Sequence, residues 1–474
     1  MKEVKYQKKR PKPLLVKEEA LAYKIQQKIL TDKVKRIKKD YGIFFTPEPI
    51  VDFTVNLIDM KRLSGKRDIS ILEPACGLAQ FLIGIKRNSP ALFRKARLFG
   101  VEINHDIVSY LTNLNIKDDI NLINADYLLW STDERFDLII GNPPYGIPSL
   151  SEHYTIRIDS ATKQKYKDIY ETWYGKYNVY GAFIEKSVKL LKPEGQLTFI
   201  VPATFMILDE FRRLRTFLAS QGSAAIIYMG PDVFKPEADV AAVILKFHKS
   251  RNSYLELLEY RDNRVRLIKN YLNWQGEVIK FETNYSRKIE GIASGKLGDV
   301  YDIRISPRTP EIRHSPYIIK GGVPDKDNYL PLLNGRNLKC HKIIYDNLTG
   351  YWIKKSEVKR LRGYFNTSHV VVGLGFRENG KVAAAYDEKS YPWMGDVYHL
   401  LKKSDLFLGN FDLDEQETVD YLNSDYLRRY VKDVYREITY HLSITQLKNL
   451  PLPNKKEWRA IKRMGYEEKP KQRP

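Results

Sequence analysis

The sequence predicts an α/β protein with a Rossmann-like, seven-stranded, mostly parallel sheet, followed by a C-terminal mixed α/β domain. Short apolar runs alternate with helical patterns from residue 69 to about residue 250, as in parallel sheets with helical crossovers. After residue 250 this alternation gives way to charged segments with frequent Gly and Pro. A length of 474 residues also exceeds one ordinary hydrophobic core, which favours two domains.

Seven apolar segments are predicted to be strands, at residues 69–72, 98–102, 121–124, 136–140, 196–201, 224–229 and 240–247. Helical patterns lie near residues 49–60, 79–87, 104–113, 180–191 and 209–220. The last two strands have no long helix between them, so one of them is expected to run antiparallel. The predicted domains are a basic N-terminal extension (1–40), a first domain (41–285), a second domain (286–455) and a basic tail (456–474).

The formal net charge is +21, from 79 Lys and Arg against 58 Asp and Glu. A lysine-rich surface without a partner usually carries matching anions. The unmatched surplus therefore favours a polyanionic partner, nucleic acid above all, because bound phosphates release counterions.

Two cysteines, Cys76 and Cys340, lie far apart, and the sequence has no CxxC motif or Cys/His cluster. This pattern predicts neither a metal site nor a disulfide framework. The basic N-terminus lacks the apolar core of a secretory signal, and no apolar run approaches the length of a membrane span. We expect a cytoplasmic protein without membrane contact.

The most informative motif is Asn142-Pro143-Pro144-Tyr145, which follows the apolar run 137–141. Two prolines end the strand and stiffen the loop. The loop then lies at the carboxyl end of a strand, where open α/β sheets bind ligands. The amide of Asn142 can accept hydrogen bonds and Tyr145 can stack, which suits a flat heterocycle with an exocyclic amine. Alternatively, Tyr145 only packs within a stiff turn.

Acidic residues end the first two predicted strands. Glu73 precedes a turn that contains Ala75 and Cys76, and such a turn brings backbone N–H groups close to a ligand. Glu73 favours a cationic group there, so the pocket suits a nucleoside that carries an amino acid. Glu102, which Ile103 follows, can accept hydrogen bonds from both hydroxyls of a ribose. The alternative is that Glu102 caps the next helix.

The third predicted strand ends at Asp126, which can accept a hydrogen bond from an adenine amine while Tyr127 packs on the ring. Four successive strands thus carry polar groups at their carboxyl ends. We predict that these groups form one cofactor site.

These motifs resemble those of the S-adenosylmethionine-dependent N6-adenine DNA methyltransferases of the gamma motif order, in which the recognition domain comes last. Phe44-Phe45-Thr46-Pro47 resembles their N-terminal motif, whose threonine holds the methionine end of the cofactor. The segment 177–183 resembles a later motif, whose phenylalanine, here Phe183, flanks the adenine of the cofactor.

The similarity to the Taq-type enzyme, which acts at TCGA, covers most of residues 41–455. In the second domain it includes segments 333–338, 391–393 and 441–443. One departure is Ala79, where many relatives have glycine, and the segment from Phe234 to Val240 is imperfectly matched.

The resemblance implies S-adenosyl-L-methionine as cofactor and double-stranded DNA as substrate, with methyl transfer to N6 of a flipped-out adenine. It further implies a monomer that is the modification half of a restriction-modification system, with a separate cognate endonuclease as a partner. The predicted catalytic residues are Asn142, Pro143, Tyr145 and Phe234. The predicted cofactor-binding residues are Thr46, Glu73, Ala75, Cys76, Glu102, Ile103, Asp126, Tyr127, Asn142, Pro144 and Phe183. Phe234 has an alternative as a core residue at a strand start.

The second domain is predicted to read the DNA sequence, and Arg308, Arg336 and Asn337 are its candidate DNA-binding residues, because arginine and asparagine address base edges bidentately. Exposed arginines also often contact only phosphates. Three rival functions share part of this pattern. Protein N5-glutamine methyltransferases carry the same loop but lack a large basic second domain. A DNA-binding specificity protein without activity would not need the four polar strand ends. N4-cytosine methyltransferases more often begin the loop with serine.

Overall fold

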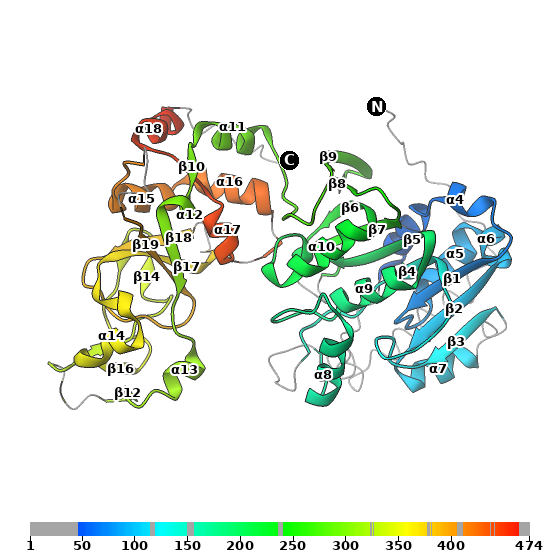
Figure 1. Cartoon of the computed structure of the whole chain (residues 1–474), viewed down its shortest axis with the longest axis horizontal. Coiled ribbons are helices and arrows are strands. Elements are labelled where there is room, and N and C mark those ends of the chain that lie inside the picture. The colour runs from blue at the N-terminus through cyan, green and yellow to red at the C-terminus, as the bar shows by residue number, and fades with distance from the viewer. Residues whose placement is uncertain are drawn as a thin grey trace. The chain divides into compact units, whose positions relative to one another are not determined.

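The computed structural model describes residues 46–113, 119–148, 156–235, 240–322, 325, 327–376, 380, 382–404, 411–436, 438–439 and 441–463. The chain divides into two compact units, unit 1 (Met1–Lys280) and unit 2 (Phe281–Pro474) (Figure 1). The predicted N-terminal extension, Phe44, Phe45 and the tail from residue 464 lie outside the described residues.

Unit 1 contains, within its described residues, one sheet of nine strands in the order β3-β2-β1-β4-β5-β7-β6-β8-β9. The strands are β1 (Ile69–Pro74), β2 (Ala96–Glu102), β3 (Ile120–Asn124), β4 (Phe136–Gly141), β5 (Leu191–Pro202), β6 (Gly222–Gly230), β7 (Ala242–Lys249), β8 (Tyr254–Arg261) and β9 (Arg264–Leu272).

Strand direction follows the prediction. β1 to β5 pair in parallel, whereas β7 lies between β5 and β6 and is antiparallel to both. Every residue of β1 and of β4 is buried, which explains why these central strands are nearly continuous apolar runs. The predicted mostly parallel α/β sheet is confirmed.

The hairpin β8–β9 extends the sheet beyond the seven predicted strands. Asp262 and Asn263 connect the two strands, and both have positive φ, 53° and 57°. Two such residues form the tight turn that suits the twist of a hairpin, and Asp and Asn tolerate this conformation. Every residue of β9 is exposed or half-buried. Its apolar residues are mixed with Arg, Lys and Asn, so the strand lacks the continuous apolar run on which the strand prediction depended.

Helices and 3₁₀ turns connect the strands of unit 1. They are α3 (Glu48–Asn56), α4 (Met60–Ser64), α5 (Gln80–Asn88), α6 (Pro90–Lys95), α7 (His105–Thr112), α8 (Ser160–Ile169), α9 (Tyr180–Leu190), η2 (Ala203–Met206), η3 (Asp209–Phe211) and α10 (Arg212–Gln221). α3 packs on α5. α9 packs on α10 (Figure 1). The sequence did not predict α6 and α8, which are short or strongly polar.

Unit 2 is a mixed α/β unit with a four-stranded antiparallel sheet in the order β11-β19-β17-β18. Its strands are β10 (Gly295–Lys296), β11 (Tyr301–Ile305), β12 (Ile318–Lys320), β13 (Tyr329–Pro331), β14 (Leu338–Lys339), β15 (Lys342–Ile343), β16 (Tyr351–Lys354), β17 (His369–Phe376), β18 (Val382–Asp387), β19 (Val397–Lys402) and β20 (Pro451–Leu452). Its helices and 3₁₀ turns are α11 (Asn284–Ile292), α12 (Leu297–Val300), α13 (Thr309–Arg313), η4 (Lys355–Glu357), α14 (Val358–Leu361), η5 (Gly363–Asn366), α15 (Glu415–Leu422), α16 (Asp425–Tyr435), α17 (Ile444–Lys448) and α18 (Lys455–Arg463).

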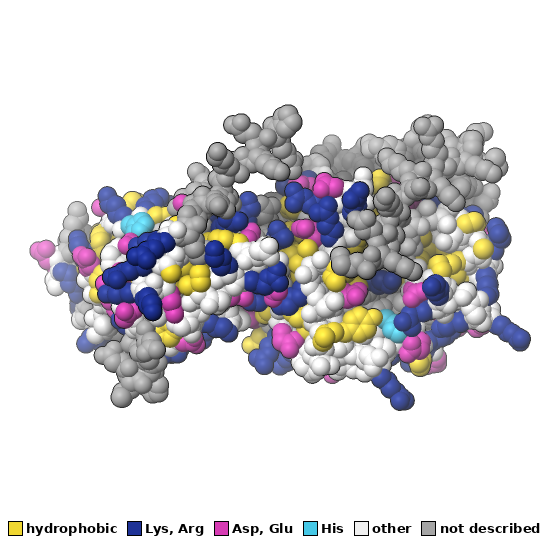
Figure 2. All heavy atoms as spheres, turned by 90° about the horizontal axis from the view of Figure 1, so that it is seen from above, with side chains coloured by type: hydrophobic (Ala, Val, Ile, Leu, Met, Phe, Trp, Pro, Cys, Tyr) yellow, Lys and Arg dark blue, Asp and Glu magenta, His cyan; other side chains and the backbone are white. Residues whose placement is uncertain are grey.

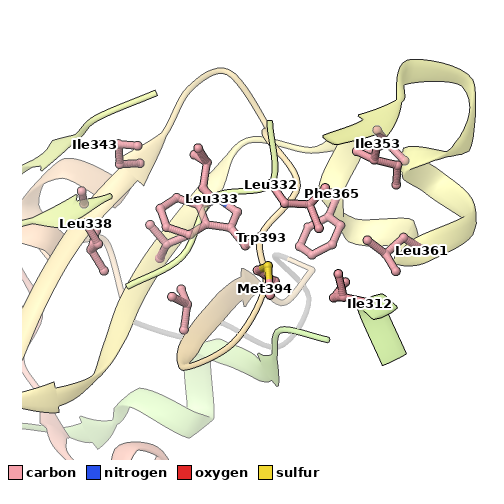
Figure 3. Close-up of a cluster of buried hydrophobic side chains, with 14 of the residues drawn as sticks. Ile312, Leu332, Leu333, Leu338, Ile343, Ile353, Leu361, Phe365, Trp393 and Met394 are labelled. Atoms are coloured by element: carbon pink, nitrogen blue, oxygen red, sulfur yellow. The ribbon is translucent and has the colours of Figure 1, made fainter. Parts of the chain in front are cut away.

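A buried apolar cluster forms the core beside this sheet (Figure 3). Trp393 lies at its centre against Leu333, and the two residues also form a backbone bridge. The indole N–H of Trp393 donates to Asp387 at 2.8 Å. This bond satisfies the polar atom of a fully buried aromatic side chain, as buried indoles require.

A chain of polar side chains also runs through this core. His369 Nδ1 lies 2.5 Å from the carbonyl oxygen of Thr367, so this nitrogen carries the proton. His369 Nε2 then accepts from His399 Nδ1 at 2.8 Å, and His399 Nε2 accepts from the Ser306 hydroxyl at 2.7 Å. With both imidazoles neutral, every one of these hydrogen bonds is satisfied. Burial lowers the pKa of both histidines, that of His399 well below its usual value.

Lys and Arg side chains are spread over the face shown in Figure 2, with Asp and Glu interspersed. Many acidic side chains of the described residues are held in ion pairs, such as Glu134 with Arg97. Among the described helices, none is long and apolar enough to cross a membrane.

Candidate functional site

The carboxyl ends of β1, β2, β3 and β4 open into one pocket in unit 1. These strands are parallel neighbours, so the residues that follow them reach the same edge of the sheet. The pocket is lined by all eleven residues predicted to bind the cofactor, namely Thr46, Glu73, Ala75, Cys76, Glu102, Ile103, Asp126, Tyr127, Asn142, Pro144 and Phe183. Their proximity agrees with the single site expected from the sequence.

The turn after β1 is held by Glu73. Its two carboxylate oxygens accept the backbone N–H groups of Phe81 and Leu82, at 3.2 and 3.0 Å, in the first turn of α5. Burial raises the pKa of Glu73 to about 8, against the opposing effect of these two donors. Glu73 therefore both caps the helix and presents a carboxyl group to the pocket.

The same turn has an unusual backbone. Ala75, Gly77 and Ala79 all have positive φ, between 51° and 55°. Non-glycine residues rarely adopt this left-handed conformation, which costs about 1–2 kcal/mol per residue. The glycine that many relatives have at position 79 suits this backbone, whereas here Ala79 adopts it without one.

Glu102 lies at the end of β2 and is nearly buried. One carboxylate oxygen accepts the backbone N–H of Gly77 and the other that of Asn104, both at 2.9 Å. Glu102 thus binds the start of the next helical segment, as one interpretation of the sequence expected, and it also lines the pocket. Its contact with a ribose stays a prediction. Each oxygen keeps a further lone pair for a ligand hydroxyl.

Asp126 and Tyr127 form the far side of the pocket, after β3. The backbone N–H of Leu128 donates to Asp126 Oδ1 at 2.9 Å, which fixes the carboxylate. The buried ring of Tyr127 lies 5.0 Å from that of Phe183, at an interplanar angle of 32°. These two rings provide a flat apolar surface beside an acceptor, as a bound adenine requires.

Asn142 occupies the edge of the pocket and its side-chain amide is clamped from both sides. Its Nδ2 donates to Thr46 Oγ1 at 3.0 Å, and its Oδ1 accepts from the Tyr145 hydroxyl at 2.5 Å. The Tyr145 hydroxyl also lies 3.0 Å from the carbonyl oxygen of Ile200. Both partners are hydroxyl groups, and the two contacts together fix the plane of the Asn142 amide.

Tyr145 and Phe234 face each other edge to face, with ring centroids 5.8 Å apart, and both are buried. Pro143 is also buried. The four predicted catalytic residues therefore include two aromatic rings in direct contact and the clamped amide. The hydroxyl contact of Tyr145 is a feature that the sequence did not suggest.

Several residues that the sequence did not predict also line the pocket. Gln80 holds the segment of Thr46 by a pair of backbone hydrogen bonds, both 3.3 Å long. Arg157 and Tyr166 reach the pocket from the region around α8. This region is polar and contains no recognisable motif, so only the three-dimensional structure reveals its proximity to the pocket.

The three predicted DNA-binding residues have different environments in unit 2. Arg308 is exposed and forms an ion pair with Asp396. Arg336 is also exposed, and its guanidinium contacts the carbonyl oxygen of Leu348.

Asn337, in contrast, is fully buried. Its Nδ2 donates to the carbonyl oxygens of Ile344 and Asp346 at 2.6 and 2.8 Å, and its Oδ1 accepts from the backbone N–H of Asn334 at 3.0 Å. The expectation that Asn337 reads a base does not fit this geometry, because its donors and acceptor are used to hold the turn.

Comparison with known proteins gives the class to which this arrangement belongs. The family model described as Eco57I restriction-modification methylase matches residues 66–234, and the TaqI-like C-terminal specificity domain matches residues 330–452. The two matches describe a methylase followed by a specificity domain.

The type II methyltransferase M.TthHB8I of Thermus thermophilus is 40% identical over 424 residues, which cover 88% of this chain and 92% of that protein. The chain therefore belongs to the type II DNA methyltransferases of restriction-modification systems, and its cofactor is S-adenosylmethionine. Modification methylase CviBIII of Paramecium bursaria Chlorella virus NC1A is 30% identical over 171 residues, which cover 36% of this chain and 40% of that protein.

Among solved structures, the ATP-dependent type ISP restriction-modification enzyme LlaBIII bound to DNA matches with a TM-score of 0.53 and 13% identity. The match covers 94% of this chain and 40% of that chain. This likeness concerns the fold alone. The predicted family and cofactor are thus confirmed by the sequence relatives.

Proposed function

We propose that the protein transfers the methyl group of S-adenosylmethionine to N6 of an adenine that is flipped out of duplex DNA. The observation that carries this proposal is the clamped amide of Asn142 at the edge of the cofactor pocket. The side-chain oxygen of Asn142 accepts from Tyr145 in the free protein, and because an amide oxygen can accept two hydrogen bonds, the proposal assigns one of these positions to a hydrogen of the target amine.

Adenine N6 is a poor nucleophile because its lone pair is delocalised into the ring. In the proposed mechanism, Asn142 Oδ1 and the carbonyl oxygen of Pro143 accept the two amine hydrogens and draw the nitrogen toward tetrahedral geometry. Thr46 keeps the donor end of the Asn142 amide turned away from the amine. The bound cofactor supplies an electrophilic methyl group on a sulfonium. Positioning and electrostatics provide the acceleration, and the spare proton leaves the nitrogen after transfer.

The pocket residues are proposed to hold the cofactor in parts. Glu102 accepts from the ribose hydroxyls, Asp126 accepts from the adenine amine, and Tyr127 and Phe183 pack on the adenine ring. Glu73 and Thr46 bind the methionine end, with Ala75, Cys76, Ile103 and Pro144 completing the walls. These residues fit the cofactor, because they combine carboxyl groups for its hydroxyls and its cationic group with an apolar slot for its base.

The target base is proposed to bind between Tyr145 and Phe234. Stacking on both faces of a base needs about 7 Å, because carbon atoms in contact lie about 3.5–4 Å apart. The two rings are 5.8 Å apart and meet edge to face. We therefore expect them to separate when the base enters, at a stacking gain of roughly 1–3 kcal/mol per base.

Residues 41–285 are proposed to be the catalytic domain and residues 286–455 the domain that reads the DNA sequence. Arg308 and Arg336 are its proposed DNA contacts, and TCGA, the site of the Taq-type enzymes, is the proposed target. A monomer can methylate one strand of such a palindrome and then rebind to methylate the other. A separate endonuclease for the same site completes the proposed system.

The rival functions account for less of the chain. A protein N5-glutamine methyltransferase has no use for the specificity domain matched at residues 330–452. A DNA-binding protein without activity has no use for the clamp on Asn142. N4-cytosine methylation uses the same chemistry and is distinguished by experiment.

The test is to incubate the protein with labelled cofactor and a pool of randomised duplexes, then identify the methylated nucleoside and its flanking sequence. The proposal expects N6-methyladenine within TCGA, and no label with Asn142→Ala. N4-methylcytosine would contradict the adenine assignment. N6-methyladenine at an unrelated site would contradict the TCGA assignment alone.

A further inference from the structure

A hydroxyl group from outside the sequence motifs reaches the adenine end of the pocket. Tyr166, on α8, lines the pocket and donates its hydroxyl to Asp126 Oδ2 at 2.6 Å. The two residues are 40 positions apart. Asp126 therefore has one partner within its own turn and one on a different element.

These contacts fix the orientation of the carboxylate. Oδ1 accepts the backbone N–H of Leu128 at 2.9 Å, and Oδ2 accepts from Tyr166. A carboxylate has about four acceptor positions, so two contacts still leave positions for a ligand. Burial, together with the bond to Asp126, raises the pKa of Tyr166 far above its usual value, so the phenol keeps the proton that it donates.

The helix that carries Tyr166 is anchored at both ends. Asp159 caps its N-terminus by accepting the N–H of Thr162 at 2.9 Å, and Lys163 Nζ donates to the carbonyl oxygen of Pro148 at 2.7 Å. Beyond its last residue, the Tyr170 hydroxyl donates to the carbonyl oxygen of Leu128 at 2.5 Å. The helix therefore holds Tyr166 in place, and less conformational entropy is lost in ordering the Asp126 side chain when a ligand binds.

We propose that Tyr166 is a positioning residue that orients the Asp126 carboxylate toward the 6-amino group of the cofactor's adenine, and so contributes to affinity and selectivity for an adenosyl cofactor. This inference rests on the proposed contact between Asp126 and the adenine amine. The alternative is that Tyr166 only fills space beside the pocket, in which case its effect does not depend on the amine.

The experiment compares two ligands by calorimetry: S-adenosylhomocysteine and its analogue in which hydrogen replaces the 6-amino group. The Tyr166→Phe variant removes only the hydroxyl. Tyr170→Phe is the matched control, because it removes a buried hydroxyl from the end of the same helix that contacts a backbone carbonyl and not Asp126. Asp126→Asn is the second reference variant, alone and combined with Tyr166→Phe.

We expect Tyr166→Phe to weaken S-adenosylhomocysteine binding by up to about tenfold, because the Asp126 carboxylate must then be ordered when the ligand binds, and to leave the analogue within about twofold. Tyr170→Phe should leave the ratio of the two affinities unchanged. In the Asp126→Asn background, Tyr166→Phe should have no further effect on that ratio.

Equal weakening of both ligands by Tyr166→Phe would overturn the proposal, as would unchanged or tighter binding of S-adenosylhomocysteine. If Asp126→Asn abolishes the preference for the amine but Tyr166→Phe does not, only the role of Tyr166 is refuted. If Asp126→Asn also leaves the preference intact, the contact assigned to Asp126 in the proposed function is refuted, and the role of Tyr166 with it.

Discussion

Replacing Glu102 with glutamine tests the cofactor site at its best-defined point. The two carboxylate oxygens accept the N–H groups of Gly77 and Asn104, and we assign their remaining lone pairs to the ribose hydroxyls. Glutamine offers one oxygen and one NH₂ group. Whichever oxygen it replaces, the NH₂ group faces a backbone N–H and a ribose hydroxyl, and neither can donate to it.

The expected loss of cofactor binding free energy follows from these hydrogen bonds. A hydrogen bond to a charged group contributes about 1.5–3 kcal/mol, and a neutral replacement about 1 kcal/mol. Weakening one ribose contact and losing the other amounts to about 3 kcal/mol, which is roughly a hundredfold increase in the Kd of S-adenosylmethionine. Glu102→Ala should be more severe, because both N–H groups of the free protein then lose their partner.

Glu185→Gln is the matched control for this experiment. Glu185 is also buried, and its two oxygens accept the backbone N–H groups of Glu171 and Thr172 at 3.2 and 3.0 Å, yet it does not line the pocket. Unlike Glu102, it also accepts from Lys189 Nζ at 2.5 Å. Calorimetry should show weakened cofactor binding for Glu102→Gln only, although both variants lose thermal stability. An unchanged Kd in folded Glu102→Gln would refute the assignment of the ribose site.

Three further predictions concern other parts of the chain. Tyr145→Phe should slow methyl transfer less than about tenfold, since Thr46 still holds Asn142 and one neutral hydrogen bond contributes about 0.5–1.5 kcal/mol. Tyr145→Ala should also reduce the fluorescence of 2-aminopurine at the target position. Equal effects of the two variants would argue against a role for the ring. Arg336→Ala should relax site selection by roughly 1–3 kcal/mol if Arg336 reads a guanine, and methylation mapping would instead show a uniform loss, with a shallower salt dependence, if it contacts phosphate. Because the pKa values of His369 and His399 are lowered in the folded state, the unfolded chain binds protons below about pH 6.5 that the folded chain does not, so unit 2 should lose up to about 1.4 kcal/mol of stability per histidine for each pH unit below that value. Protection factors for hydrogen exchange in β17 and β19 that are the same at pH 7.5 and 5.5 would contradict this.

The sequence predicted the sheet of unit 1 because its central strands are buried on both faces and therefore read as apolar runs. The polar residues at the strand ends stand out against those runs, so the sequence alone assigns Glu73, Glu102, Asp126 and Asn142 to one pocket. Parallel topology is sufficient to bring them together.

Other features depend on contacts between segments that are distant in the sequence, and no local sequence pattern predicts them. Tyr166 lies on a polar helix and meets Asp126 across 40 positions. The hydroxyl contact between Tyr145 and Asn142 depends on side-chain geometry within a loop. Asn337 follows an arginine in a Gly-containing turn and looks exposed in the sequence, but the fold turns its side chain inward.

The most direct test of the central claim is the single-turnover rate of methyl transfer by Asn142→Ala, measured beside its affinity for S-adenosylhomocysteine. Asn142 is assigned to the target amine and contacts Thr46 and Tyr145 in the free protein. The account predicts that the rate falls by at least about a hundredfold, as when a donor or acceptor that acts in the transition state is removed, while Kd stays within about threefold. A near-normal rate, or a collapse of cofactor affinity that accounts for the lost activity, would contradict it.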